Sequence, residues 1–223
     1  DMSRGLGDVY KRQEGLTETI YSIGEEQSLE AAYYRNTIIH FFVNVGITEL
    51  AIALGVVHQS AMDEDSIVDR AMGLRDLFKF EFFFDSKEEF DGQIRSEIDR
   101  YRVASTADSN VVMVDVEAML PAKSPVVLRP FLEAYYVVAS ALATFGDTPT
   151  TSDELASACL AMGEQLYANG TITNPESVST TLFSSGIELA ENRDLLTGSS
   201  EDREEFLTEV GGALEAVSDI ARL

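Results

Sequence analysis

The sequence predicts a mainly α-helical protein, a helical bundle with a short strand or hairpin near residues 104–130. Apolar residues recur at spacings of three and four through most of the chain, which is the period of an amphipathic helix. Two Ser/Thr-x-x-Glu sequences, at Ser86 and Thr151, have the form of a capping box at a helix start. The helical period stops between residues 104 and 130, where valines stand at every second position from 112 to 116, as in a half-buried strand.

Three helices are predicted before this interruption. The first spans residues 28–58, with Ser28 as its N-cap. The second follows the acidic cluster at residues 63–65, because the helix dipole favours negative charge at a helix N-terminus. This cluster lacks the continuation of an EF-hand loop, so no cation site is expected there. The third helix begins at the capping box of Ser86 and Glu89.

Four helices are predicted after the interruption. They are residues 131–145, a helix capped by Thr151 and Glu154 that ends near Gly170, a helix opened by Asn174 and Pro175 that ends near Leu195, and residues 201–223. We therefore expect two helical subdomains, residues 14–103 and 131–223, joined by a strand or loop connection at 104–130. Residues 1–13 resemble translated adaptor sequence and show no signal-peptide core, so they are expected to be a non-native leader.

Composition and charge exclude several classes of function. The 39 acidic and 16 basic residues give a net charge of −23, which would repel a phosphate backbone, so no nucleic-acid partner is expected. The single cysteine, Cys159, excludes an intrachain disulfide, and with two histidines it leaves too few ligands for a zinc site. Cys159 sits among apolar residues and is interpreted as an inert core thiol. No metal and no cofactor are predicted.

Residues 37–57 form the most apolar segment, with Glu49 as its one formal charge. As a helix this segment would be ~31 Å long, enough to cross the core of a bilayer. Polar residues nevertheless recur along it every three or four positions: Tyr33, Thr37, His40, Asn44 and Thr48. We therefore favour a central bundle helix with paired polar groups over membrane insertion and over a seam that lines a ligand channel.

Five phenylalanines fall within residues 78–84, and they cannot all face inward from one helix. One interpretation is that the helix ends here and its last turn wedges between two layers of the core. The other is a contact with a membrane or with another part of the protein, made by Phe80, Phe82, Phe83 and Phe84.

His58 and Asp63 match the pattern H-x-x-x-x-D, in which a histidine accepts a hydroxyl proton and an aspartate orients its ring. Acidic residues are so frequent here that a histidine meets one at a given offset by chance. The intervening residues 59–62 also include no arginine or glycine that could receive a phosphate or shape a turn. The pair is therefore interpreted as a helix end followed by an acidic cap, and no catalytic residue is predicted.

Three blocks of the sequence resemble a known family. The first block is AYYRNTIIHFFVN at residues 32–44, the second is LRDLFKFEF at 74–82, and the third is LRPFLEAY at 128–135. They are similar to blocks of bacterial glycerol-3-phosphate acyltransferases, particularly the actinobacterial ones. With helices similar to the tail of that family, the resemblance covers most of residues 14–223.

The resemblance implies an enzyme of phospholipid biosynthesis that transfers an acyl group from acyl-CoA or acyl carrier protein to glycerol 3-phosphate. Such an enzyme would work at the cytoplasmic side of the cell membrane, in contact with the membrane surface. The family's catalytic H-x-x-x-x-D block and its phosphate-binding blocks precede the first block, and this chain has no counterpart to them. We therefore expect the non-catalytic C-terminal part of the enzyme, inactive alone, whose partner is a missing catalytic domain.

The candidate contacts with that domain lie in the first block: Tyr33, Tyr34, Arg35, Asn36 and His40. A buried salt bridge is the alternative role for Arg35 and Asn36. Two other hypotheses remain open. The chain could be an autonomous helical interaction or regulatory module, winged-helix-like between residues 151 and 195, or a complete small acyltransferase that uses His58.

Overall fold

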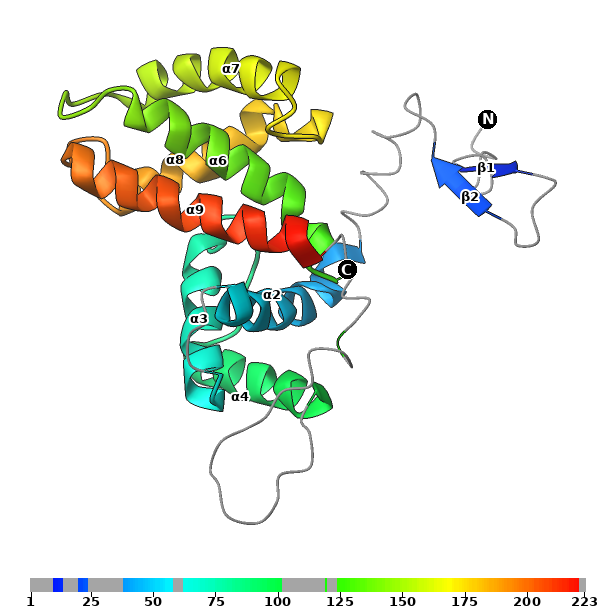
Figure 1. Ribbon diagram of the computed structural model, residues 1–223. Helices are drawn as coiled ribbons and strands as arrows, with labels where there is room; N and C mark the ends of the chain where they lie inside the picture. Colours follow the sequence, from blue (N-terminus) through cyan, green and yellow to red (C-terminus); the bar gives the residue numbers. More distant parts are fainter. Residues whose placement is uncertain are drawn as a thin grey trace. The chain divides into compact units, whose positions relative to one another are not determined.

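The computed structural model describes residues 10–13, 20–23, 38–57, 62–101, 119 and 124–220 (Figure 1). The chain divides into two compact units, residues 1–41 and 42–223, and each is described by itself. In the first unit, β1 (Tyr10–Gln13) pairs antiparallel with β2 (Ile20–Ile23), and η3 (Ile39–Phe41) is a short 3-10 helix. The secondary-structure elements described in the second unit are all helices, so the prediction of a mainly α-helical protein is confirmed.

The α-helices of the second unit are α2 (Val43–Val57), α3 (Glu64–Leu77), α4 (Lys87–Ile98), α6 (Arg129–Ala143), α7 (Ser152–Ala168), α8 (Thr180–Asn192) and α9 (Ser200–Ile220). Its short 3-10 helices are η4 (Asp99–Tyr101), η5 (Ser124–Leu128) and η6 (Pro175–Ser177). α6 lies against α7, α8 and α9, whereas α2 lies against α3, α4 and η5 (Figure 1). The two groups of helices meet where α2 contacts α9.

The strand or hairpin expected near residues 104–130 is not supported. The described residues of this stretch are Met119 and residues 124–130, and the latter form η5 and the first turn of α6. Pro125 lacks the N–H that a strand would donate, and its fixed φ suits a helical turn. The alternating valines at 112–116 lie outside the described residues.

The apolar segment is a central bundle helix from Val43 to Val57, whereas Ile39–Phe41 form the separate 3-10 helix η3, so the expected continuous helix is broken before Val43. Its α-helix, α2, begins at Val43, and its residues Ile47, Leu50 and Ile52 are fully buried. The amide of Asn44 donates to Gln93 Oε1 in α4 at 2.7 Å, and the hydroxyl of Thr48 donates to the carbonyl of Asn44 at 2.8 Å. These two polar groups are paired inside the protein, as the favoured interpretation predicts.

One described stretch is long and apolar enough to cross a membrane by length and composition, namely Ser124–Ala143, which comprises η5 and α6. Its most apolar window has a mean hydropathy of 1.4, and 67% of that window is buried inside the protein. Burial of this extent is what the core helix of a bundle shows. The α6 part of this stretch is accordingly the core of the α6–α9 group.

Two glycines let neighbouring helices approach closely. A Cβ on Gly186 of α8 would lie 3.0 Å from Val138 Cγ2 and 3.2 Å from Tyr135 Cδ1, both in α6. A Cβ on Gly163 of α7 would lie 3.2 Å from the ring of Phe183. Both glycines are buried, so they serve helix packing despite their low helix propensity.

The predicted helix starts are largely confirmed. Asp63 caps α3 by accepting a hydrogen bond from the Ser66 amide, and capping boxes open α4 at Ser86 and α7 at Thr151. The Asn174–Pro175 prediction is only partly right, because this pair opens the short helix η6 and α8 begins five residues later, at Thr180.

Candidate functional site

The second and third blocks meet in the structure. Phe78, which follows α3, is fully buried, and its ring centroid lies 6.1 Å from that of Tyr135 in α6. The ring of Phe82 meets Phe131 of α6 edge to face at 5.0 Å. Edge-to-face and offset contacts between aromatic rings stabilise a fold by ~0.5–1.5 kcal/mol beyond their burial. Phe78 and Phe82 therefore wedge into the core, as the first interpretation of the phenylalanine run predicts.

The other phenylalanines of the run differ in exposure. Phe84 meets the ring of Phe90 in α4 edge to face at 5.5 Å, and the ammonium of Lys79 lies 5.4 Å from the ring centroid of Phe80. The side chain of Phe83 is fully exposed. Among the four candidate contact residues, Phe83 is thus the one that presents its whole ring to solvent.

The third block places a charged residue inside the apolar helix α6. Glu133 is fully buried, and its carboxylate accepts five hydrogen bonds of 2.8–3.1 Å from Thr173, Asn174 and Ser177. Arg129, one turn earlier, donates to the same carboxylate at 3.0 Å. Burial alone would raise the pKa of Glu133, but the hydrogen bonds from Asn174, Thr173 and Ser177 hold that pKa below its ordinary value. The anion fixes the α7–α8 connection to α6.

The second block contains a carboxyl, Glu81, whose pKa is shifted in the opposite direction to that of Glu133. Glu81 lies in the turn after α3, and burial raises its pKa to about 7, with a hydrogen bond from Ser185 in α8 as the one opposing influence. The nearby hydroxyl of Tyr135 is buried and has no hydrogen-bond partner. Burial, and then the charges of Glu81 and Glu188, raise the pKa of Tyr135. The junction of the two blocks therefore disfavours negative charge.

A third buried carboxyl occupies α2. Glu49 is 5% exposed, and its Oε1 accepts a hydrogen bond from the Tyr101 hydroxyl at 2.7 Å. Its Oε2 has no hydrogen-bond partner of standard geometry. Burial raises the pKa of Glu49, against the lowering effect of Tyr101 and Ser124. Glu49 thus ties α2 to the end of α4.

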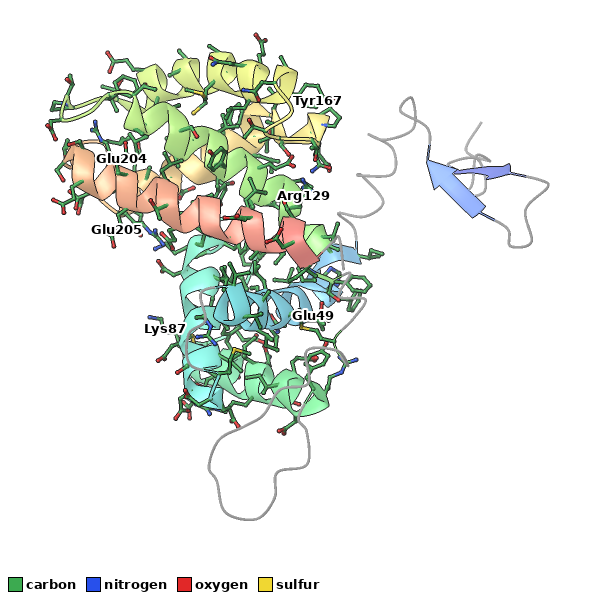
Figure 2. The ribbon with its side chains drawn as sticks, viewed as in Figure 1. Glu49, Lys87, Arg129, Tyr167, Glu204 and Glu205 are labelled. Carbon is green, nitrogen blue, oxygen red and sulfur yellow. The ribbon has the colours of Figure 1, made fainter. Side chains whose placement is uncertain are left out.

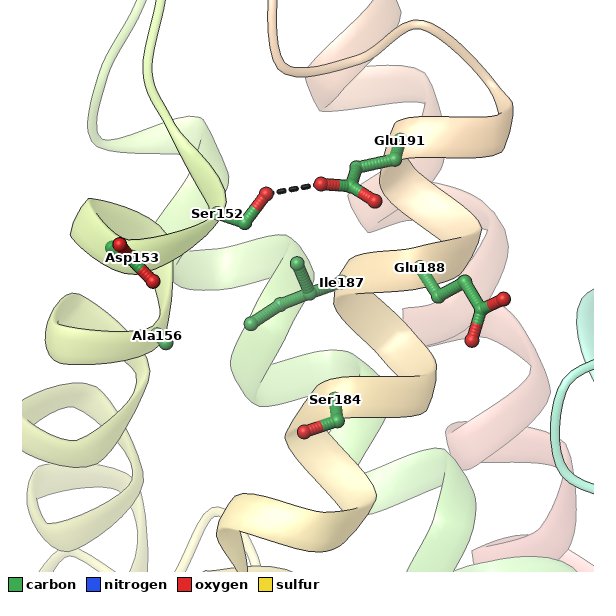
Figure 3. Close-up of a pocket in the computed structure, with 7 residues that line it drawn as sticks. All are labelled: Ser152, Asp153, Ala156, Ser184, Ile187, Glu188 and Glu191. Atoms are coloured by element: carbon green, nitrogen blue, oxygen red, sulfur yellow. Dashed lines mark hydrogen bonds between the residues drawn. The ribbon is translucent and has the colours of Figure 1, made fainter.

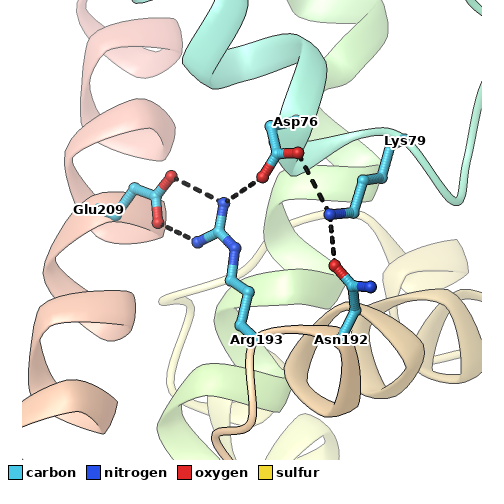
Figure 4. Close-up of polar contacts among 5 residues, drawn as sticks. All are labelled: Asp76, Lys79, Asn192, Arg193 and Glu209. Carbon is cyan, nitrogen blue, oxygen red and sulfur yellow. Dashed lines mark hydrogen bonds and ion pairs between the residues drawn. The ribbon is translucent and has the colours of Figure 1, made fainter.

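An ion-pair network joins the two groups of helices (Figure 4). The guanidinium of Arg193, at the end of α8, binds Glu209 of α9 and also Asp76 of α3 at 3.3 Å. Lys79 binds Asp76 at 3.1 Å and Asn192 of α8 at 2.5 Å. Burial lowers the pKa of Arg193, but the hydrogen bonds that its guanidinium donates to Glu209 and Asp76 outweigh burial and raise that pKa. This network links the second block to the ends of α8 and α9.

Arg203 performs a similar role deeper in the protein. Its side chain is fully buried and donates to the carbonyls of Gly146 and Thr148 after α6 and of Leu195 and Leu196 after α8. A buried guanidinium needs such acceptors, because an unpaired buried charge is strongly destabilising. Arg203 therefore holds together the two loops that precede α7 and α9.

The lysines and arginines with described side chains are mostly engaged within the chain. All except Lys87 donate to a carboxylate, an amide or a carbonyl oxygen: Arg70, Arg75, Lys79, Arg95, Arg100, Arg129, Arg193 and Arg203. Exposed carboxylates, in contrast, line the outer side of α9, where Glu204 and Glu205 point away from the protein (Figure 2). The described surface therefore favours cationic over anionic ligands.

A groove of about 360 Å³ lies between α7 and α8 (Figure 3). Its lining includes the carboxylates of Asp153, Glu188 and Glu191, the hydroxyls of Ser152 and Ser184, and no basic side chain. The hydroxyl of Ser152 donates to Glu191 and so connects the two helices. A phosphate in this groove would meet three carboxylates, which is electrostatically unfavourable.

The remaining predicted site residues are distributed as follows. Tyr33, Tyr34, Arg35, Asn36 and His58 lie outside the described residues. His40 lies in η3, with its ring centroid 3.9 Å from that of Phe41. The carboxylate of Asp63 caps α3, and the hydrogen bonds from Ser66 lower its pKa. Cys159 is fully buried, and burial raises the pKa of its thiol to about 12, which agrees with an inert core thiol.

Sequence reasoning did not single out Glu133, Glu81 or Arg203. A signal for the first and third was present, because each is a charged residue on the apolar side of a helix. Glu133 stands four residues before Val137, and Arg203 stands three residues before Phe206. Glu81 had no comparable signal, because it lies in a turn whose path the sequence does not reveal.

Comparison with known proteins identifies the relatives of this chain. The family model described as "Glycerol-3-phosphate acyltransferase C-terminal region" matches residues 3–199. Proteins named "Putative acyltransferase plsB1" from Mycobacterium bovis and from two strains of Mycobacterium tuberculosis are 34% identical to it over 236 aligned residues. The alignment covers 100% of this chain and 37% of each relative, so the chain spans little more than a third of their length. No solved structure matches significantly.

Proposed function

The chain belongs to the family of glycerol-3-phosphate acyltransferase C-terminal regions, and from this premise we propose that it is the non-catalytic helical part of such an acyltransferase. The parent enzyme transfers an acyl group from acyl-CoA or acyl carrier protein to glycerol 3-phosphate at the cytoplasmic side of the cell membrane. The observation that carries this proposal is the family match over residues 3–199. The match to relatives named as acyltransferases supports it.

The arrangement of charge supports a structural rather than a catalytic role. Eight described cations are engaged within the chain, and the groove between α7 and α8 is lined by carboxylates, so glycerol 3-phosphate and coenzyme A meet an unfavourable surface. Asp63, the acid of the H-x-x-x-x-D match, serves as a helix cap. In this proposal the reactive groups belong to the catalytic domain of the parent enzyme, which this chain supports.

The contacts with the catalytic domain are assigned to the first block, at Tyr33, Tyr34, Arg35, Asn36 and His40. Phe83 is the favoured residue of the phenylalanine run for a contact with that domain or with the membrane surface, because its ring is fully exposed. Phe82 and Phe84 bury part of their rings against the core and are therefore less suited to such a contact.

The first experiment assays the chain alone. Purified residues 1–223 should show a helical circular dichroism spectrum and no transfer from labelled acyl-CoA to glycerol 3-phosphate, whereas the intact parent enzyme should be active. Acylation by the chain alone, abolished by His58→Ala, would establish the complete small acyltransferase instead.

The second experiment tests the supporting role. The catalytic part of the parent enzyme, expressed without this region, should lose activity and regain it when residues 1–223 are co-expressed, and the two pieces should co-purify. A catalytic part that is fully active alone and does not bind the chain would favour the autonomous interaction module. That alternative has one observation in its favour, because residues 42–223 form a compact unit with its own buried core.

A further inference from the structure

Phe83 lies in a turn that is fixed on both sides of it. On the N-terminal side, the amides of Glu81 and Phe82 donate to the carbonyl of Phe78 at 2.9 and 3.0 Å. Phe78 is fully buried, and the ring of Phe82 meets that of Phe131 in α6 at 5.0 Å. The backbone that leads into Phe83 is therefore anchored to α6.

The C-terminal side of Phe83 is held by α3 and α4. The ring of Phe84 meets that of Phe90 in α4 edge to face at 5.5 Å, and the guanidinium of Arg75 in α3 lies 5.4 Å from the ring centroid of Phe84. Arg75 also donates to the carbonyl of Asp85 at 2.9 Å. Phe83 thus stands between two anchored rings, and its direction is set before any partner binds.

The ring of Phe83 is fully exposed, whereas the rings of Phe82 and Phe84 meet each other edge to face at 6.3 Å. An aromatic side chain on a fixed backbone binds a partner with little loss of conformational freedom. Aromatic residues are also enriched among the few that dominate the affinity of protein interfaces. The geometry of the turn therefore fits a binding anchor.

The charges beside Phe83 disfavour a lipid surface as its partner. Residues 85–89 contain three exposed carboxylates, Asp85, Glu88 and Glu89, and one cation, Lys87, in a chain of net charge −23. The cytoplasmic face of a membrane is itself negatively charged and attracts segments that are rich in lysine and arginine. One ring also buries less apolar area than a single acyl chain, which by itself gives only marginal membrane binding.

A protein partner with a basic surface suits the same charges. Glycerol 3-phosphate and acyl-CoA carry phosphate groups, so a domain that binds them needs basic side chains. The relatives named as acyltransferases have most of their length outside the region that aligns with this chain. The catalytic domain of the parent enzyme is thus the partner whose expected charge complements the acidic turn.

We propose that Phe83 is a preformed aromatic anchor that inserts into an apolar pocket, rimmed by basic side chains, on the catalytic domain of the parent enzyme. This inference rests on the proposed function, which supplies that domain. The pocket encloses the ring, and the basic rim pairs with the exposed carboxylates of residues 85–89. Phe82 and Phe84 stay in the core and orient the ring between them.

Photo-cross-linking in the intact parent enzyme tests this contact. Phe83→p-benzoylphenylalanine, in enzyme reconstituted into vesicles of phosphatidylethanolamine and phosphatidylglycerol, should form a covalent link to a peptide of the catalytic domain on irradiation. Glu205→p-benzoylphenylalanine, on the exposed side of α9, gives the background and should yield little of that product (Figure 2). Links to lipid alone, an equal yield from position 205, or no cross-linked product would overturn the proposal.

Smaller substitutions cover the case in which the benzophenone group distorts the turn. Phe83→Ala should leave the thermal unfolding midpoint of the chain alone unchanged, because the ring is fully exposed there. In the intact enzyme it should lower the inactivation temperature by a few degrees, and Phe83→Leu should restore most of that loss. Leu160→Ala, at an exposed apolar position of α7, should be neutral in both proteins. An inactivation temperature that Phe83→Ala does not change would refute the pocket.

The activity of the unsubstituted intact enzyme separates this inference from the proposed function. An enzyme that acylates glycerol 3-phosphate, but whose position 83 links to lipid alone, would keep the acyltransferase assignment and refute the pocket. An intact enzyme that acylates no glycerol 3-phosphate would contradict the proposed function, and with it the identity of the partner domain.

Discussion

Glu133 is a fully buried carboxyl and Glu81 a partly exposed one in the family blocks, and their pKa values shift in opposite directions. The carboxylate of Glu133 accepts five hydrogen bonds from the loop before α8 and an ion pair from Arg129, and its pKa is lowered. Glu81 has Ser185 as its one hydrogen-bond partner, and its pKa is raised to about 7. The more deeply buried carboxyl is the one that stays charged, so the number of hydrogen-bond donors, and not burial alone, decides the direction of the pKa shift.

The first prediction concerns Glu133, the carboxylate with more hydrogen-bond donors, and a substitution that removes its charge. Glu133→Gln keeps the size of the side chain but turns an amide N–H₂ toward groups that are themselves donors. We expect a loss of about 3 kcal/mol in the free energy of unfolding, because breaking a buried charged network leaves its partners unpaired. Urea denaturation at pH 7, followed by circular dichroism, measures this loss.

Two control variants provide reference values for the loss of unfolding free energy in Glu133→Gln. Ser177→Ala removes one of the five hydrogen bonds and should cost about half as much, because a hydrogen bond to a charged group contributes ~1.5–3 kcal/mol. Glu205→Gln changes an exposed residue of α9 and should be close to neutral. A Glu133→Gln protein as stable as the Glu205→Gln protein would show that the network contributes little.

The second prediction concerns the contact between α8, which carries Gly186, and α6, which carries Glu133. Gly186→Ala places a Cβ 3.0 Å from Val138 Cγ2 and 3.2 Å from Tyr135 Cδ1, so α8 must move away from α6. We expect a loss of about 2 kcal/mol by overpacking, partly offset by the higher helix propensity of alanine. Gly92→Ala in α4 meets no atom within 4 Å and should instead stabilise by about 0.5–1 kcal/mol. Equal effects of the two substitutions in chemical denaturation would contradict close packing at Gly186.

The sequence predicted those features that depend on neighbouring residues. The caps at Asp63, Ser86 and Thr151 are local interactions within four residues, so composition and spacing were enough to place the starts of α3, α4 and α7. The burial of α2 and α6 followed from their apolar composition in the same way.

The features that sequence reasoning missed depend on distant residues. Glu133 finds its partners about 40 residues later in the chain, and these contacts explain the partly wrong prediction at Asn174. Asn174 and Ser177 turn their donors toward Glu133, and the backbone at Val178 leaves the helical region with φ −90° and ψ 70°, so η6 ends before α8 begins. Nothing within a few residues of Asn174 encodes that competition.

The third prediction is a pH dependence caused by Glu81. Its folded pKa of about 7 lies above the ordinary 4.5, so this group contributes its full stability below pH 4.5, where it is protonated in both states. That contribution falls as pH rises, and is lost once pH exceeds 7. Allowing for partial solvent exposure, Glu81→Gln should be more stable than the wild type by about 1 kcal/mol at pH 8 and equal to it near pH 4. Chemical denaturation of both proteins from pH 4 to pH 8 measures the difference, and a constant difference would contradict the raised pKa.

The smallest expected effect is that of Ser185→Ala, which distinguishes two contributions of residue 185 to stability: its helix propensity and its hydrogen bond to Glu81. Ser185→Ala raises helix propensity in α8 by about 0.5 kcal/mol at every pH, because alanine is the best helix former. It also removes the hydrogen bond to Glu81, which stabilises the ionised carboxylate and therefore matters only at high pH. The variant should be more stable than the wild type near pH 4 and lose about 0.5 kcal/mol of that advantage by pH 8. The pH-independent gain comes from the helix and the pH-dependent loss from the carboxylate. A gain that stays constant across this range would mean that Ser185 does not stabilise the ionised Glu81 carboxylate. Glu81 would then have no effective hydrogen-bond donor, whereas Glu133 accepts five hydrogen bonds.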